Sequence, residues 1–261
     1  MKDFKTLTIS FEDRLIRITL NRPEIHNAFN EVMISELTEA FGDAGGEKGA
    51  RAIFLTGNGK SFCAGADINW LKKVKDYSFK ENLKDSLALA KLFEAIYTHN
   101  LPVIGLINGS AIGGGCGLAA VCDIAIASEE AIFSLSELKL GVIPAVISPY
   151  IVKRIGEGKT RELFLTGQRI NAAQALAIGL VNFTVPAFSL EEKAQEIFSS
   201  IKTSGPNAIL ETKKLFRTIG RINLKKIGVH TARLIAKLRA SEEGQEGTAA
   251  FLEKRKPGWV D

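Results

Sequence analysis

Short apolar runs alternate with longer amphipathic stretches over the first half of the chain. Two β-rich runs at residues 5–10 and 15–20 flank a charged turn, which predicts a hairpin. Apolar residues then recur every four positions behind Asn30, which predicts a helix capped by that side chain. Further buried strands are predicted at residues 52–55 and 102–107. Strands alternating with helices in this way indicate an α/β fold with a mostly parallel sheet and crossover helices.

Beyond residue 148 the pattern is almost wholly helical, with segments separated by glycine or proline. The helices of this region carry apolar positions on more than one side, including Ile222 and Ile235. Such helices need more apolar partners than one sheet face supplies, which indicates a subunit interface. We therefore expect a core of residues 1–195 followed by a C-terminal helical region of residues 196–261.

Composition narrows the classes of protein. The chain has 261 residues and is 46% hydrophobic, which excludes disorder and allows a sizeable core. No apolar run approaches the roughly 20 residues of a membrane span, and no signal peptide is visible. The three cysteines, Cys63, Cys116 and Cys122, cannot all pair, and none has zinc-ligand spacing. We expect a reduced, metal-free protein of the cytoplasm.

The net charge of +5 is concentrated at the C-terminal end. Residues 201–261 contain 13 Lys and Arg against 6 Asp and Glu. A basic segment of this kind suits nucleic acid, a membrane surface or a phosphorylated small ligand, although solvated helix faces explain it equally well. Aromatic residues that could stack on bases do not interleave the basic positions, which makes nucleic acid the less favoured partner. An RNA-binding protein is the non-enzymatic alternative.

Two glycine-bearing loops follow two of the apolar strands, at residues 61–68 and 108–115. Glycine after a strand lets the backbone approach a ligand and present free N–H groups, and glycines at a helix start add the positive end of a dipole. Two such N–H groups converging on one oxygen would form an oxyanion hole. Each loop alone is a weak signal, because three consecutive glycines more often serve tight helix–strand packing than catalysis. Neither a Walker A motif nor a dinucleotide-binding fingerprint is present.

One acidic residue stands among apolar neighbours. Glu137 follows a predicted buried strand and precedes a turn at residues 141–144. Burial there would raise the pKa of its carboxyl and suit it to general acid–base chemistry near neutrality. The alternative is an exposed glutamate in a turn.

Five ordered motifs together resemble the crotonase family, the enoyl-CoA hydratases and isomerases. They are Asn21-Arg22-Pro23 with Asn27-Ala28, Phe62-Cys63-Ala64-Gly65-Ala66-Asp67-Ile68, Asn108-Gly109 with Gly113-Gly114-Gly115, Cys122-Asp123-Ile124, and Ser136-Glu137 with Gly141 and Pro144. The C-terminal segment 251–257 is also similar to the end of that family. Gly117 together with residues 147–150 is most similar to the bacterial methylglutaconyl-CoA hydratase subgroup.

The resemblance implies a crotonase-like spiral of β-β-α turns with a C-terminal region that assembles homotrimers or dimers of trimers. It implies an acyl-CoA thioester substrate and no separate cofactor. Glu137 would be the acid–base group, and the N–H groups of Ala66 and Gly114 would form the oxyanion hole. By the same resemblance, coenzyme A would be held by Glu24, Ile25, His26, Ala64, Ala66, Asp67, Ile68, Phe251 and Lys254. The Asp67 and Asp123 carboxylates are expected to bond turns and caps.

One departure from the family pattern bears on mechanism. Typical hydratases of the family use two glutamates, and the position of the first is Gly117 here. Glu137 alone would then activate water and deliver the α-proton, or would shuttle a proton between carbons as an isomerase. We also expect Gly117 to open volume for a branched or carboxylated acyl group such as 3-methylglutaconyl. That interpretation predicts poor turnover of straight-chain crotonyl-CoA.

Overall fold

The computed structural model describes residues 2–219 and 223–260, and the chain divides into two compact units. The first unit is Met1–Gln195 and the second is Glu196–Asp261. The first has the predicted α/β architecture, and the second is helical. Ile222, one of the apolar positions that predicted a partner surface, lies outside the described residues.

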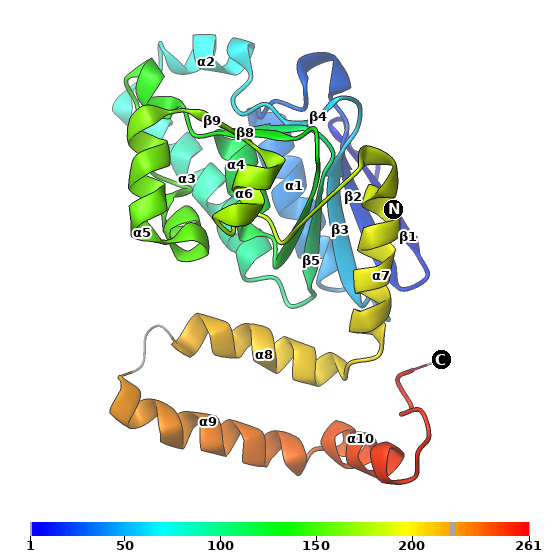
Figure 1. The fold of residues 1–261 in the computed structure, drawn as a ribbon. Helices are drawn as coiled ribbons and strands as arrows, with labels where there is room; N and C mark the ends of the chain where they lie inside the picture. The colour runs from blue at the N-terminus through cyan, green and yellow to red at the C-terminus, as the bar shows by residue number, and fades with distance from the viewer. Residues whose placement is uncertain (1, 220–222, 261) are drawn as a thin grey trace. The chain divides into compact units, whose positions relative to one another are not determined.

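A six-stranded sheet forms the frame of the first unit (Figure 1). The predicted hairpin is confirmed, because its two strands pair antiparallel from Leu7↔Leu20 to Glu12↔Leu15. The remaining neighbours pair parallel, as expected for strands joined by crossovers. In spatial order the strands are β1 (Leu7–Glu12), β2 (Leu15–Leu20), β3 (Ala52–Gly57), β5 (Val103–Ile107), β7 (Ile124–Ser128) and β10 (Phe183–Val185).

A smaller sheet of four short strands positions the candidate site. Its order is β4 (Ser61–Cys63), β6 (Ser110–Ile112), β8 (Ile132–Ser134) and β9 (Arg169–Asn171). The first three are mutually parallel, so their carboxyl ends share one edge. Each end leads directly into one of the three predicted elements of the site, because residues 64–67 follow β4, Gly113 follows β6, and Glu137 lies three residues beyond β8. Ligands in α/β folds typically bind outside this edge.

Helices connect the strands of the first unit. They are α1 (Glu31–Ala44), α2 (Ile68–Val74), α3 (Phe79–Tyr97), α4 (Gly114–Val121), α5 (Ser148–Thr166) and α6 (Ala172–Ala177), with single 3₁₀ turns η1 (Pro23–Ile25), η2 (Glu137–Leu140) and η3 (Ala187–Ser189). The predicted cap of α1 is confirmed, since the Asn30 side chain accepts from the Met33 N–H at 2.9 Å. The glycine-bearing loop predicted at residues 61–68 instead contains β4 and the first residue of α2.

The second unit begins within α7 (Leu190–Lys202) and continues through α8 (Pro206–Ile219), α9 (Leu224–Arg239) and α10 (Glu242–Leu252). Lys213 and Ala250 are the buried residues among those described in α8, α9 and α10. Helices that bury so few of their residues typically form surfaces that pack against a partner. Within the described ranges, no helix combines the length and apolar character that crossing a membrane requires.

Candidate active site

The carboxyl ends of β4, β6 and β8 surround one pocket of about 460 Å³. Three predicted catalytic positions, Ala66, Gly114 and Glu137, line it together. Glu137 is the one ionisable side chain among the described residues of its wall, and the rest of the wall is mainly apolar. The apolar part comprises Phe29, Trp70, Leu71, Leu89, Ile112, Leu140, Ile143, Pro144, Val146 and Ile147.

The orientation of the Ala66 amide is fixed by a short parallel bridge to Phe29. The Phe29 N–H donates to the Gly65 carbonyl at 2.6 Å, and the Asp67 N–H donates to the Phe29 carbonyl at 2.8 Å. Because the carbonyl and N–H of a trans peptide point in opposite directions, the Ala66 N–H points away from Phe29. It donates no hydrogen bond within the described part of the chain and so is free for a ligand oxygen.

The Gly114 amide belongs to the first turn of α4, where N–H groups have no partner inside the helix. Gly113 precedes it with φ of +53°, a conformation that favours glycine. A Cβ on Gly114 would come within 2.9 Å of the Phe29 ring, so glycine is required for the helix start to approach that side chain. In this way Phe29 contacts both donor loops, one through its backbone and the other through its ring.

The Glu137 carboxyl lies beside the same helix start. Its Oε1 is 2.9 Å from where a Cβ of Gly113 would be, and its Oε2 is buried with no hydrogen-bond partner among the described residues. Burial raises the pKa of this carboxyl, against a smaller opposing contribution from the residue's own backbone N–H. Glu137 is therefore a half-buried residue in the pocket wall and not an exposed turn glutamate, and its acid–base role stays a prediction.

The prediction that Gly117 opens volume for a branched acyl group is wrong. A Cβ at this position would come within 2.4 Å of Ile147 Cγ2 and within 3.0 Å of the Phe93 ring. The space that a side chain at position 117 would need is occupied by these two hydrophobic side chains. Gly117 is buried and does not line the pocket, so it adds no room for a branched acyl group.

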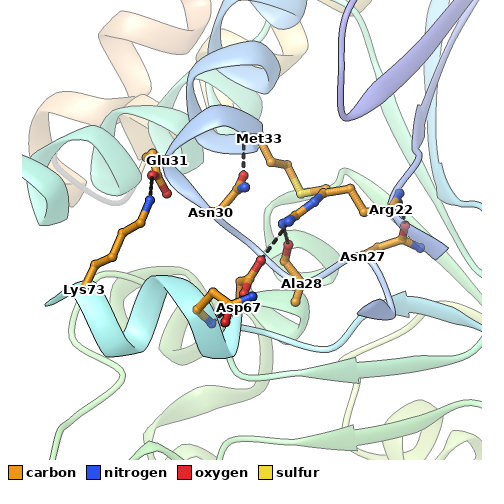
Figure 2. Close-up of polar contacts among 9 residues, drawn as sticks. Arg22, Asn27, Ala28, Asn30, Glu31, Met33, Asp67 and Lys73 are labelled. Atoms are coloured by element: carbon orange, nitrogen blue, oxygen red, sulfur yellow. Dashed lines mark hydrogen bonds and ion pairs between the residues drawn. The ribbon is translucent and has the colours of Figure 1, made fainter. Parts of the chain in front are cut away.

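Asp67 is held by an ion pair rather than directed into the pocket. Its Oδ2 lies 2.7 Å from Nη2 of Arg22, and its Oδ1 accepts from the Asn69 N–H at the start of α2 (Figure 2). Burial opposes ionisation of Asp67, but the bonds from Arg22 and Asn69 outweigh it and lower the pKa of the carboxyl below its usual value. The cap role expected for Asp67 is confirmed. Asp123 likewise accepts from the Val103 N–H at 2.7 Å.

Other predicted coenzyme A residues lie beside the same loop. The His26 carbonyl accepts from the Ala64 N–H at 3.0 Å, and its ring Nδ1 lies 3.0 Å from Ser61 Oγ. This places the Glu24–His26 segment next to the end of β4. Glu24 and His26 are exposed, Ile25 is half-buried, and Ile68 is 71% exposed. These residues therefore surround the predicted donor loop without lining the pocket itself.

Phe251 and Lys254 belong to the second unit. The Phe251 side chain is 82% exposed, and Lys254 is exposed with φ of +55°. The neighbouring cation Arg255 is committed to Glu246 and Glu253, each at 2.6 Å. The positive charge around Lys254 is therefore lower than the sequence Lys254-Arg255-Lys256 suggests, because Arg255 is paired with two carboxylates. The contact of Lys254 with coenzyme A stays a prediction.

Sequence reasoning missed two residues that build the site. Arg22 was noted as part of a motif but given no role, and Phe29 was not noticed at all. Arg22 Nη1 donates to the Ala28 carbonyl at 2.7 Å while Nη2 bonds Asp67, so it connects the two segments that form the bridge (Figure 2). The available signal was the spacing of Arg22 from Asn27-Ala28 in the first motif.

The chain is similar to known proteins over nearly its whole length. The sequence model described as enoyl-CoA hydratase/isomerase matches residues 10–261. The crystal structure of an enoyl-CoA hydratase from Shewanella pealeana ATCC 700345 shares 38% identity and a TM-score of 0.94, covering 98% of this chain and 96% of that one. The short-chain-enoyl-CoA hydratase of Clostridium acetobutylicum is 32% identical, covering 97% of each chain. The 2,3-dehydroadipyl-CoA hydratase of Escherichia coli is 31% identical, covering 96% of this chain and 97% of its own.

Proposed function

Since the chain belongs to the crotonase family and is an enoyl-CoA hydratase, we propose that Glu137 is its single acid–base group, with Ala66 and Gly114 as oxyanion donors. The observation that carries the proposal is the position of the Glu137 carboxyl beside the start of α4, with its Oε2 buried and without a hydrogen-bond partner among the described residues. A desolvated carboxylate is a stronger base than an exposed one, which suits activation of water. Hydratases of this family need no cofactor.

The chemistry requires one proton to move twice. Glu137 as carboxylate takes a proton from water while the water oxygen bonds to Cβ of the enoyl thioester. The electron pair of the double bond moves to the thioester carbonyl, whose oxygen becomes negatively charged and accepts from the Ala66 and Gly114 N–H groups. Glu137 then returns the proton to Cα, which regenerates the carboxylate. Each oxyanion donor of this kind lowers a barrier by roughly 3–4 kcal/mol.

The acyl group that we propose is short, apolar and uncharged. The pocket wall offers indole, leucine, isoleucine and proline surface, and its one ionisable side chain among the described residues is itself acidic. A second carboxylate on the acyl chain would meet no cation there and would be costly to desolvate. The methylglutaconyl-like substrate expected from the sequence also loses its volume argument at Gly117. A carboxylated, methylglutaconyl-like substrate stays the alternative. Two relatives of similar identity to this chain are named for the two kinds of acyl group, one for 2,3-dehydroadipyl-CoA and one for short-chain enoyl-CoA.

Coenzyme A is proposed to follow the loop around Ala64 and the Glu24–His26 segment, which lie beside each other. Lys254 would contribute a phosphate contact, and Phe251 an apolar one.

We further propose a homotrimer or a dimer of trimers, because α8, α9 and α10 bury few residues within their own unit. The cytoplasmic location expected from the cysteines stays part of the proposal, and Cys63, Cys116 and Cys122 are all buried.

The test is turnover of three thioesters, crotonyl-CoA, a 3-enoyl-CoA and 3-methylglutaconyl-CoA, by the wild type and by Glu137→Gln. We expect crotonyl-CoA to be hydrated best, and Glu137→Gln to lose about 10²–10⁴-fold in kcat. The variant should still bind acetyl-CoA in calorimetry, which shows that its pocket is folded.

Each contrary outcome has a definite meaning. Near-full activity of Glu137→Gln would make Glu137 a structural residue only. Preference for 3-methylglutaconyl-CoA would restore the carboxylated substrate. Turnover of the 3-enoyl thioester alone would favour double-bond isomerisation, for which a single carboxylate moving a proton between carbons is sufficient.

A further inference from the structure

Arg22 and Asp67 form a buried ion pair beside the proposed oxyanion hole without lining the pocket. We propose that this pair is a positioning device that sets the orientation of the Ala66 N–H and neutralises the charge next to it. The inference rests on the proposed function, because it assigns a role relative to the oxyanion hole.

The geometry links the pair to both sides of the bridge. Ala28, whose carbonyl accepts from Arg22 Nη1 at 2.7 Å, immediately precedes Phe29. Asp67, whose Oδ2 lies 2.7 Å from Arg22 Nη2, immediately follows Ala66. One guanidinium therefore connects the two segments whose bridge fixes the direction of the Ala66 amide (Figure 2). Arginine suits this role because its planar group makes two directed bonds at once.

The backbone of Arg22 is also held in place. The Arg22 backbone N–H donates to Asn27 Oδ1 at 2.8 Å, and Asn27 Nδ2 donates to the Ser61 carbonyl at 2.8 Å in β4. Arg22 is thus tied to the strand that leads into the Ala66 loop. A support of this kind keeps a donor in place before the substrate arrives, which is what oxyanion stabilisation requires.

Charge gives the pair a second effect. The Asp67 side chain is 7% exposed and lies one residue from Ala66. An unneutralised carboxylate at this distance would oppose negative charge on the thioester oxygen, and burial would strengthen the opposition. Arg22 cancels that charge, so the Ala66 N–H faces an electrostatic environment that permits an oxyanion.

The experiment compares Arg22→Gln and Arg22→Lys with a matched control, Lys73→Met. Lys73 pairs with Glu31 at 2.7 Å and so joins α2 to the start of α1, but it is exposed and bonds neither Ala28 nor Asp67 (Figure 2). The readouts are kcat and KM for the best enoyl-CoA, the melting temperature, and the absorption of bound 4-(dimethylamino)cinnamoyl-CoA. That absorption moves to the red when the thioester carbonyl accepts strong hydrogen bonds.

We expect Arg22→Gln to lose about 10- to 100-fold in kcat, since deleting a whole oxyanion donor costs about 10²–10³-fold. KM should change far less, because the lost interaction is realised in the transition state. The red shift of the bound thioester should shrink with kcat. Arg22→Lys, which keeps the charge but not both bonds, should fall between wild type and Arg22→Gln, and Lys73→Met should match wild type. If Arg22→Gln does not fold, Arg22→Lys carries the comparison.

Three outcomes would overturn the inference. Wild-type kcat and red shift in the Arg22 variants, with or without a lower melting temperature, would leave the pair a purely structural one and the proposed function intact. Equal losses of kcat and red shift in Lys73→Met would show that removing any positive charge near the site has this effect, whichever bonds the side chain makes. A wild-type enzyme that hydrates its substrate without any red shift would remove the oxyanion hole itself, and the positioning role with it.

Discussion

The position of the Glu137 carboxyl suits catalysis but lowers the free energy of unfolding. Its Oε2 is buried without a partner among the described residues, and burial raises its pKa. An acid whose pKa is higher in the folded than in the unfolded state binds more protons when folded, over the interval between the two values. The free energy of unfolding therefore falls as pH rises through that interval, and the cost is fully present above it.

This predicts that Glu137→Gln is more stable than wild type at pH 7, by roughly 0.5–2 kcal/mol, while losing most of its activity. The difference should shrink as the pH falls through the usual glutamate pKa, about 4.3, because below that value the wild-type carboxyl is mostly neutral in both states. Urea unfolding at pH 4 and pH 7 measures it. Glu130→Gln, at an exposed position, is the control and should change stability at neither pH. Equal effects of Glu137→Gln at both pH values would contradict the assigned cause.

The residue scale also shows where sequence reasoning stops. Ala66, Gly114 and Glu137 were found because each follows a strand in a recognisable motif. Arg22 was overlooked because its importance depends on reaching Asp67, 45 positions away, across a bridge that no local pattern shows. The volume at Gly117 was misjudged for the same reason, since Ile147 occupies it from 30 positions further along the chain.

At the scale of elements, the long and strongly periodic segments were predictable, whereas most of the three-residue strands were not. The hairpin and α1 follow from local pattern and capping. The strands β4, β9 and β10 each have three residues and exist through pairing with distant partners, so their sequences carry no period to detect. The smaller sheet, which positions the site, was therefore the part of the fold least accessible to sequence analysis.

The helix α4 gives a prediction at this scale. Alanine normally favours a helix interior by about 1 kcal/mol over glycine, but at Gly117 its Cβ would meet Ile147 Cγ2 at 2.4 Å. Isoleucine is β-branched and stiff at χ1, so it cannot yield by rotating. We expect Gly117→Ala to destabilise by about 1–2 kcal/mol through overpacking, and to become neutral or stabilising in an Ile147→Ala background.

A matched control exists in α1. A Cβ on Gly42 would meet nothing within 4 Å, so Gly42→Ala should raise the free energy of unfolding by up to about 1 kcal/mol. Urea unfolding of Gly42→Ala, Gly117→Ala and the double variant with Ile147→Ala measures all three. A Gly117→Ala variant as stable as Gly42→Ala would show that the helix can shift to make room, and that the site tolerates a side chain at position 117.

At the scale of the whole molecule, the two units differ in how completely each buries its own large apolar side chains. The first buries most of its large apolar side chains, whereas α8 and α9 leave Phe216, Val229 and Ile235 at 67%, 57% and 48% exposure. A groove of about 440 Å³ runs between these two helices, with a wall that includes Leu215, Ile235 and Leu238. Exposed apolar surface of this kind is typical of subunit interfaces.

We therefore expect light scattering to give about three or six times the chain mass of 28.3 kDa. Ile235→Asp should lower that mass, because a charge in the groove would have to be desolvated on assembly. Ala236→Asp adds the same charge one position further on, outside the groove, and should leave the mass unchanged. A wild-type mass of one chain would refute the assembly. Equal dissociation by both variants would instead place the interface on the neighbouring face of α9, because Ala236 would then be part of the contact.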